Sequence, residues 1–210
     1  MQLRLTKRRK QAIATKESLF RTAVELFNDR GYDNVTVEEI TNRVGVAKGS
    51  FYTYFRSKSD IVIEEFEEID NYYRRYSRNL TRYDSATKRL SAFTRAQLRY
   101  VRDTVGLKLL KLLYANNIEI SDSESILIDT KRYLHEIVQE IVVYGQERGE
   151  FRTDRDADTI TLYINRAMRS AFLDGAISDA EFDLVTEGLA FCHTMICPAL
   201  QKDRPDYSSM

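Results

Sequence analysis

Apolar residues recur at helical spacing along most of the chain. They fall every three or four positions from Gln11 to Asn28 and again from Ser57 to about Leu80. The later segments with the same period are 85–103, 107–114, 125–148, 160–172 and 181–200. No strand-like alternation interrupts them, and both prolines, Pro198 and Pro205, lie near the end. The pattern predicts an all-α fold of about nine helices.

The segment from residue 36 to residue 60 has a different pattern, typical of two short helices joined by a tight turn. Its two apolar stripes are formed by Val37, Ile40 and Val44 and by Phe51 and Phe55. Gly45 stands where the first helix has to end. The spacings of Thr36 with Glu39 and of Ser57 with Asp60 predict capping boxes at two helix starts. This arrangement is that of a helix-turn-helix, whose second helix enters the major groove of DNA.

A series of glycine, aromatic and apolar positions runs through the same region. Its members are Phe27, Gly31, Tyr32, Thr36, Val37, Ile40, Val44, Gly45, Val46, Gly49, Phe51, Tyr52, Tyr54, Phe55 and Lys58. The series resembles the DNA-binding motif of TetR-family transcriptional repressors and covers roughly Gln11 to Ile63. The resemblance implies a DNA-binding domain at 1–56 and a helical effector-binding and dimerisation domain at 57–210. Ala47 departs from the resemblance, since many members of the family have a capping Ser at this position. Without that cap the start of the second short helix is less stable by about 0.5–2 kcal/mol.

Side chains at the start of the second short helix have the chemistry that DNA contact requires. Lys48 can reach guanine acceptors, and Tyr52 offers a ring and a hydroxyl to bases. Gly49 lets the backbone approach. The candidates for phosphate contact are Ser50, Thr53, Tyr54, Thr36 and Lys58.

Charge is distributed unevenly although the net charge of the chain is +0. Residues 1–60 hold 12 of the 32 Lys and Arg and 7 of the 32 Asp and Glu, which leaves 20 and 25 for the rest. A basic first segment on an acidic body suits a protein that meets DNA with one end. The cluster of Arg4 with Lys7 to Lys10 either follows phosphates or is a solvated end.

The last two predicted helices are apolar on more than one face. Such faces can pack within one chain or against a second copy in a four-helix bundle. The TetR resemblance favours the second alternative and implies a homodimer. The predicted interface residues are Ile164, Met168, Phe172, Val185, Leu189 and Ile196.

Aromatic residues with polar tips are frequent in the C-terminal part, and such residues line ligand pockets as well as cores. The resemblance implies a small-molecule effector. The candidates for its pocket are Tyr76, Phe93, Tyr100, Tyr114, Tyr133 and Tyr163.

Other classes of site find little support. His135 and His193 lack metal-ligand spacing, so we expect no metal or other cofactor. Cys192 and Cys197 lie five residues apart, about 140° around an α-helix, so we expect buried free thiols that point apart. No apolar run approaches about 18 residues, which predicts no membrane span.

The sequence therefore predicts a cytoplasmic DNA-binding regulator. We expect a homodimeric repressor that a small molecule releases from a palindromic operator, and the sequence does not separate repressor from activator. Two alternatives stand beside it. One is an architectural DNA-binding protein without an effector. The other is a helical enzyme, which would need a catalytic group that we do not find.

Overall fold

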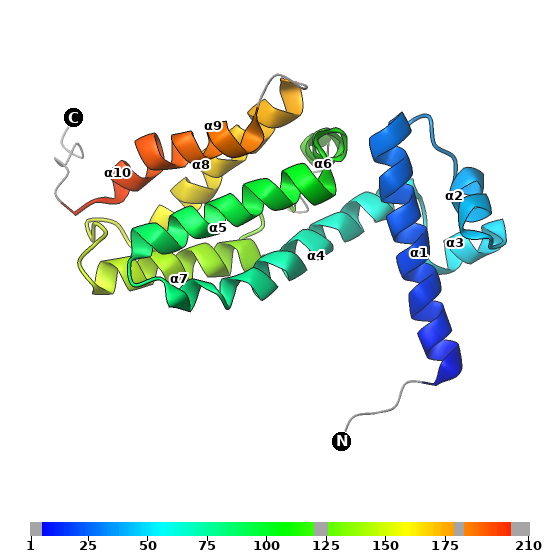
Figure 1. Ribbon diagram of the computed structural model, residues 1–210, viewed down its shortest axis with the longest axis horizontal. Helices are drawn as coiled ribbons and strands as arrows, with labels where there is room; N and C mark the ends of the chain where they lie inside the picture. Colours follow the sequence, from blue (N-terminus) through cyan, green and yellow to red (C-terminus); the bar gives the residue numbers. More distant parts are fainter. Residues whose placement is uncertain (1–5, 120–125, 179–182, 203–210) are drawn as a thin grey trace. The chain divides into compact units, whose positions relative to one another are not determined.

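The computed structural model describes residues 6–119, 126–178 and 183–202 (Figure 1). Within these ranges all regular elements are helices, and one isolated pairing joins Phe151 to Gln201. Nine helices are present there when helical segments that follow each other without a break are counted together and the three-residue 3₁₀ turn η1 (Leu80–Arg82) is left out. The all-α prediction is confirmed. The chain forms two compact units, Met1–Phe66 and Glu67–Met210.

The first unit contains α1 (Lys7–Arg30), α2 (Val37–Val44), α3 (Lys48–Tyr54) and the first turns of α4 (Lys58–Ser77). Helix α1 begins earlier than its apolar pattern, because Thr6 caps it by accepting a hydrogen bond from the Arg9 N–H. Ile13, an apolar residue within the segment predicted as helical from Gln11 to Asn28, is 42% exposed. The core of this unit is formed by Leu19, Ala23, Leu26, Phe27, Val35, Ile40, Phe51, Phe55, Ile61 and Val62.

Helix α4 contains the boundary between the two units, later in the chain than the sequence prediction of 56/57. Its first turns have contacts within the first unit, since Lys58 binds the carbonyl of Tyr32 and Glu64 binds Lys16 at 2.7 Å. Its later turns have contacts within the second unit, including the ion pair of Asp70 with Arg132. A prediction from motif length cannot include such contacts, which explains the difference.

The second unit continues with a series of helices. After α4 these are η1 (Leu80–Arg82), α5 (Ala86–Tyr100), the π-helical turn η2 (Val101–Val105), α6 (Leu107–Glu119), α7 (Tyr133–Glu147), α8 (Ala157–Ile177), α9 (Leu184–Phe191), the π-helical turn η4 (Cys192–Ile196) and α10 (Cys197–Leu200). Large apolar side chains form its core, among them Phe93, Leu90, Leu98, Leu109, Leu113 and Phe151.

Several boundaries in this unit differ from the sequence prediction. Helix α6 continues to Glu119, past the predicted end at residue 114, and α8 runs from Ala157 to Ile177 rather than from 160 to 172. Helix α7 begins at Tyr133 rather than Ser125. Before it, the Ile126 N–H donates to Asn117 Oδ1 (3.1 Å), and Arg132 is the N-cap. The hydrogen bond of Ile126 competes with helix formation at that residue, and the apolar period does not reveal it.

The final helix changes its winding at η4. Pro198 has no N–H, and its ring would clash with the carbonyl four residues earlier, that of Thr194. The preceding turn is wider, and the Cys197 N–H donates to the carbonyl of Cys192, five residues back. The predicted divergence of Cys192 and Cys197 is therefore wrong, since their sulfur atoms lie 3.8 Å apart. Both thiols are free and buried, as expected.

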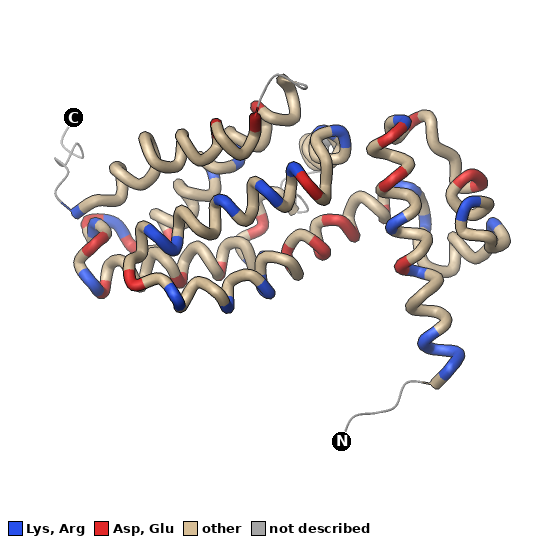
Figure 2. The backbone as a smooth tube through the Cα atoms, viewed as in Figure 1, with Lys and Arg blue, Asp and Glu red and all other residues tan. Residues whose placement is uncertain are grey.

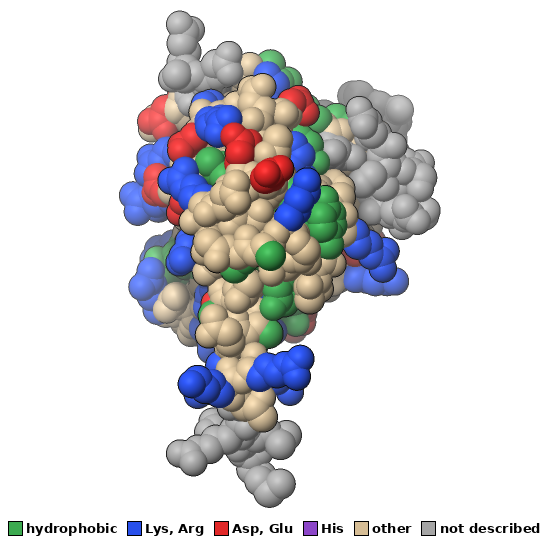
Figure 3. Space-filling model, turned by 90° about the vertical axis from the view of Figure 1, so that its right-hand side faces the viewer, with side chains coloured by type: hydrophobic (Ala, Val, Ile, Leu, Met, Phe, Trp, Pro, Cys, Tyr) green, Lys and Arg blue, Asp and Glu red, His purple; other side chains and the backbone are tan. Residues whose placement is uncertain are grey.

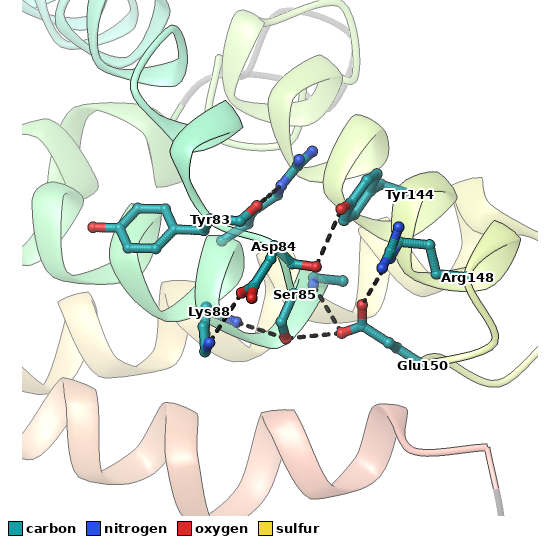
Figure 4. A network of polar contacts seen from close by, with 9 residues as sticks. Tyr83, Asp84, Ser85, Lys88, Tyr144, Arg148 and Glu150 are labelled. Carbon is teal, nitrogen blue, oxygen red and sulfur yellow. Dashed lines mark hydrogen bonds and ion pairs between the residues drawn. The ribbon is translucent and has the colours of Figure 1, made fainter.

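The loop after α7 holds the start of α5 (Figure 4). Glu150 Oε2 accepts hydrogen bonds from Ser85 Oγ and from the Ala86 N–H, both at 2.8 Å. The guanidinium of Arg148 lies 3.5 Å from the other carboxylate oxygen. A Cβ at Gly145 would come within 2.8 Å of the Ala86 Cβ, so only glycine permits this approach of α7 to α5.

Candidate nucleic-acid interface

The turn between α2 and α3 is fixed by caps at both ends of α2. Thr36 Oγ1 accepts from the Glu39 N–H at 3.2 Å, and Glu39 Oε2 accepts from the Thr36 N–H at 2.8 Å. This confirms the predicted capping box. The hydrogen bond from the Thr36 backbone, and then Arg30, lower the pKa of the Glu39 carboxyl. At the other end, Gly45 has φ 78° and ψ 34°, the left-handed conformation that glycine adopts without strain.

Helix α3 has one buried and one exposed face. Phe51 is fully buried in the core of the first unit. Lys48, Gly49 and Thr53 are exposed, and Tyr52 is 53% exposed. The predicted base-contacting residues therefore share one solvent-facing surface. We call this surface, formed by Lys48, Gly49, Tyr52 and Thr53, the α3 face.

The remaining candidates lie around the α3 face with less exposure. Ser50 and Tyr54 are half-buried, whereas Thr36 is exposed at the start of α2. Ala47 is the N-cap of α3 and makes no side-chain cap hydrogen bond, as its residue type predicts. The backbone N–H groups in the first turn of α3 therefore find no hydrogen-bond acceptor on the side chain of the N-cap residue.

The packing of the first unit does not require a glycine at position 49. A Cβ built there meets nothing within 4 Å, and its φ lies outside the positive range. Glycine in a helix costs up to about 1 kcal/mol relative to alanine. No described neighbour and no backbone strain requires a glycine at position 49. The close approach of an external molecule would require one.

Lys58 has a structural role that its sequence position did not reveal. Its Nζ donates to the carbonyl oxygens of Tyr32 and Val35, both at 2.7 Å, and lies 4.2 Å from the centre of the Tyr32 ring. Two of its three N–H groups thus join the start of α4 to the loop between α1 and α2. The second predicted cap differs as well, because Asp60 Oδ2 accepts from the Arg56 N–H at 2.7 Å, whereas Ser57 donates to Asp60 Oδ1 only through its hydroxyl, at 3.4 Å.

The first turn of α1 is basic, and Figure 2 shows this at the beginning of the tube. Lys7, Arg8, Arg9 and Lys10 are all exposed, and no acidic residue lies in that turn. Figure 3 shows basic side chains gathered beside the point where the described chain begins. Cations at a helix N-terminus oppose the helix dipole, so this arrangement disfavours the isolated helix and favours an anionic partner. Arg4 lies outside the described residues.

The candidate effector residues of the second unit do not all come together. Tyr73 is buried and contacts the Phe93 ring edge-on, at 5.5 Å between centroids. Tyr72 stacks on Tyr100 at 4.0 Å and lies 6.2 Å from Tyr76. These rings form an aromatic layer between α4 and α5.

The other three candidates have separate surroundings. Tyr114 is buried, and its hydroxyl donates to the carbonyl of Arg169 at 3.1 Å. Tyr133 is 39% exposed and lies under the guanidinium of Arg74. Tyr163 is 54% exposed on α8.

Charged groups accompany the buried tyrosines, and the sequence analysis missed them. Arg132 donates two hydrogen bonds to Asp70, at 2.8 and 2.9 Å. Arg169 is half-buried, and no ion pair of its guanidinium is found among the described residues. Burial lowers the pKa of the Arg169 guanidinium, and the charges of Arg166 and Arg132 act in the same direction. A cation in that position favours an anionic ligand.

An apolar groove of about 300 Å³ runs between α8 and the helix from α9 to α10. Its lining includes Tyr163, Ala167, Phe191, Met195 and Ala199, together with Ile164 and Ile196 of the predicted dimer interface. Of the six predicted interface residues, Ile164, Ile196, Met168 and Val185 are buried in the single chain, and Phe172 and Leu189 are half-buried. Tyr163 and Met195 are the more exposed apolar side chains of this groove, with exposed fractions of 54% and 60%.

Within the described ranges, no group of three or more His, Cys, Asp or Glu side chains is placed to hold a metal ion. None of the helices found there has the length and apolar character needed to cross a membrane.

Comparison with known proteins places the helix-turn-helix in a family. Residues 19–64 match the family described as bacterial regulatory proteins, tetR family. The transcriptional regulator AcuR of Cereibacter sphaeroides is 42% identical over 59 residues, which is 28% of this chain and 27% of AcuR. The fatty acid metabolism regulator protein of Bacillus subtilis is 24% identical over 164 residues, covering 78% of this chain and 84% of that protein.

A solved structure extends the likeness of the fold. Thermus thermophilus FadR, a TetR-family repressor in complex with lauroyl-CoA, aligns with a TM-score of 0.65 at 21% identity. The alignment covers 91% of this chain and 98% of FadR.

A helix-turn-helix at the start of an all-α chain, followed by a larger helical unit, defines a one-component DNA-binding regulator of transcription. Residues 19–64 of this chain match the TetR family of bacterial regulatory proteins, and the chain shares the fold of a solved TetR-family structure. Of the proteins named above, AcuR and Thermus thermophilus FadR are regulators of transcription.

Proposed function

We propose that the protein is a homodimeric repressor that binds a palindromic operator through the α3 face and leaves it when an acidic small molecule binds the second unit. The observation that carries the DNA-binding part is the α3 face itself. Lys48 and Tyr52 are exposed beside Gly49, a glycine that the packing of the described protein does not require.

Each residue of the interface has a proposed contact. Lys48 donates to guanine acceptors, and Tyr52 contacts bases with its ring and hydroxyl. Gly49 allows the helix backbone to approach the groove. Ser50, Thr53, Tyr54, Thr36 and Lys58 contact phosphates, and for Lys58 only the third N–H is left for this after its two carbonyl partners.

The proposed dimer covers the groove between α8 and the α9–α10 helix. Tyr163 and Met195 are exposed there, and an apolar groove of this kind fits a second copy of the same two helices across a two-fold axis. Homodimers are the form in which helix-turn-helix proteins read two half-sites one helical turn apart. We assign DNA binding to residues 1–56 and effector binding and dimerisation to residues 57–210, so that the two functions divide at the beginning of α4.

The proposed effector carries an anionic group and an apolar part, as an acyl-CoA thioester does. Two observations support this class. Arg169 is half-buried close to Arg132 and Tyr114, and a solved structure of similar fold holds lauroyl-CoA. The aromatic layer of Tyr76, Phe93 and Tyr100 provides apolar surface in the same unit. Such a ligand releases DNA only through its differential affinity for the two states of the dimer. We place this activity in the cytoplasm, where the operator is.

Selection of bound sequences from a random DNA library tests the DNA-binding part. We expect a palindromic consensus for the wild type. Lys48→Ala and Tyr52→Ala should lose discrimination at individual bases, by about 1–3 kcal/mol for a bidentate contact. Lys88→Ala, a substitution of an exposed lysine in the second unit, serves as the control and should keep the consensus. Unchanged preference in both α3 variants would overturn the proposed interface.

Titration with an acyl-CoA series tests the effector part on the selected operator. We expect release that depends on the acyl chain, and Arg169→Met should weaken it without changing operator affinity in the absence of ligand. If no member of the series releases the wild-type protein, the proposed effector class is wrong. Constitutive binding is the alternative, and failure to be released by any small molecule would favour it.

A further inference from the structure

The two cysteines are the nucleophilic pair that the regulatory function leaves unused. Cys192 and Cys197 occupy the two ends of the π-helical turn η4, and their sulfur atoms lie 3.8 Å apart. In a regular α-helix residues five apart point about 140° away from each other. The wider turn before Pro198 brings the two side chains to the same side of one helix.

Both thiols of the pair are buried and contact each other, and Cys192 also contacts the hydroxyl of Thr94. Cys192 is fully buried, and its Sγ lies 3.7 Å from Thr94 Oγ1 on α5. Cys197 is 7% exposed, which leaves a small opening to solvent. The hydrogen bond donated by the Cys197 thiol lowers the pKa of the Cys192 thiol, and the Thr94 hydroxyl acts in the same direction. The thiolate is the reactive form of cysteine, so this contact favours reaction at Cys192.

We propose that Cys192 and Cys197 form a reversible redox site, in which a hydroperoxide converts the dithiol into a disulfide within a single helix. The Cys192 thiolate attacks the peroxide oxygen, gives a sulfenic acid and releases water or an alcohol. The Cys197 thiol then attacks the sulfenic sulfur, forms the S–S bond and releases a second water as its proton passes to the leaving hydroxide. The peroxide is reduced by two electrons, and a thiol reductant restores the pair.

The geometry requires only a local movement. The sulfur atoms have to approach from 3.8 Å to the length of a disulfide bond, about 2.05 Å. Both belong to one continuous helical segment, so no second element has to move toward them. The inference needs only the folded second unit and is independent of the proposed operator and effector.

Oxidation of the purified protein with hydrogen peroxide, followed by alkylation and peptide mass mapping, tests the proposal. We expect the peptide that holds both cysteines to lose the mass of two hydrogen atoms, to resist alkylation and to recover both properties after reduction. Exposed Met195 gains oxygen instead, and the fragment masses separate the two reactions. Cys192→Ser and Cys197→Ser should each abolish the mass loss.

Pro198→Ala provides a second test that addresses the π-helical turn. It removes the reason for the wide turn, so we expect slower disulfide formation, with circular dichroism to confirm the fold. The proposal is overturned if both thiols stay alkylatable at peroxide levels that oxidise free methionine in the same solution, or if oxidation yields only sulfinic acid or disulfides between chains. An unchanged rate in a folded Pro198→Ala protein would contradict the geometric cause.

Discussion

Asp70 on α4 accepts two hydrogen bonds from Arg132 at the N-cap of α7, at 2.8 and 2.9 Å. The two side chains are only 12% and 9% exposed. The pair joins an element that runs through both units to a helix of the second unit, beside the buried Tyr73. A contact of this kind fixes where α7 begins.

We expect Asp70→Ala to destabilise the protein by about 3–5 kcal/mol, because it leaves the buried Arg132 without its partner. Urea denaturation followed by circular dichroism measures the loss. Asp84→Ala removes an exposed partner of Lys88 and should change stability by less than about 1 kcal/mol. Equal effects of the two variants would contradict a buried role for Asp70.

Lys58→Ala should lower both stability and operator affinity. Two charge-assisted hydrogen bonds to carbonyl oxygens disappear, each worth about 1.5–3 kcal/mol. Thermal denaturation and fluorescence anisotropy on the selected operator measure the two effects. Lys48→Ala is the matched control, since Lys48 is 58% exposed and lies 3.9 Å from Glu38, so it should affect affinity alone. A Lys58→Ala protein of wild-type stability would argue against the positioning role.

Gly49→Ala should separate helix stability from DNA binding. Alanine favours α3 by up to about 1 kcal/mol, while the new Cβ occupies the surface that we assign to the groove. We therefore expect a higher melting temperature together with weaker operator binding. Ala47→Ser, which supplies a cap worth about 0.5–2 kcal/mol, should raise the melting temperature without that loss. Operator affinity that rises in Gly49→Ala would remove the argument for close approach.

Neutralising the first turn of α1 should have opposite effects on folding and binding. The double variant Arg8→Gln, Arg9→Gln has fewer cations at the N-terminus of α1. The interaction with the helix dipole is then less unfavourable, so α1 should be slightly more stable. If both side chains contact phosphates, the slope of log affinity against log salt should fall by about 1.8. Anisotropy titrations at several salt concentrations measure the slope. A constant slope would show the turn to be a solvated end.

Charge in the α8–α10 groove should separate the proposed dimer. Tyr163→Glu and Met195→Glu place carboxylates on exposed apolar positions, so the monomer should remain folded while association is lost. Analytical ultracentrifugation measures the state. Ile177→Glu changes a 63% exposed residue of α8 that does not line the groove and should leave the dimer intact. Persistence of the dimer in both groove variants would place the interface elsewhere.

Local signals in the sequence were sufficient for the DNA-binding unit. The Thr36–Glu39 capping box, the turn at Gly45 and the buried Phe51 are all determined within a few residues of each other, and the structure has each of them. Apolar spacing also predicted a helix at 85–103, where the structure has α5 followed directly by η2. These features depend on backbone hydrogen bonds and side-chain period, which short sequence windows contain.

Contacts between residues far apart in the chain were not accessible in this way. The start of α7 depends on hydrogen bonds of Arg132 to Asp70, and the role of Lys58 depends on carbonyl groups in an earlier loop. The dimer residues inferred from periodicity, such as Met168 and Val185, are buried in the monomer, because period alone does not say which of two apolar faces meets the core.

The sequence by itself determined the class of protein, the helix-turn-helix and the residues of its exposed face, since these follow from caps, turns and helical period. Only the tertiary structure decided that Arg169 is half-buried, which side chains line the groove, and how Cys192 and Cys197 lie. The physical reason is that burial, ion pairing and the widened turn before Pro198 depend on neighbours that the chain brings together only when it folds.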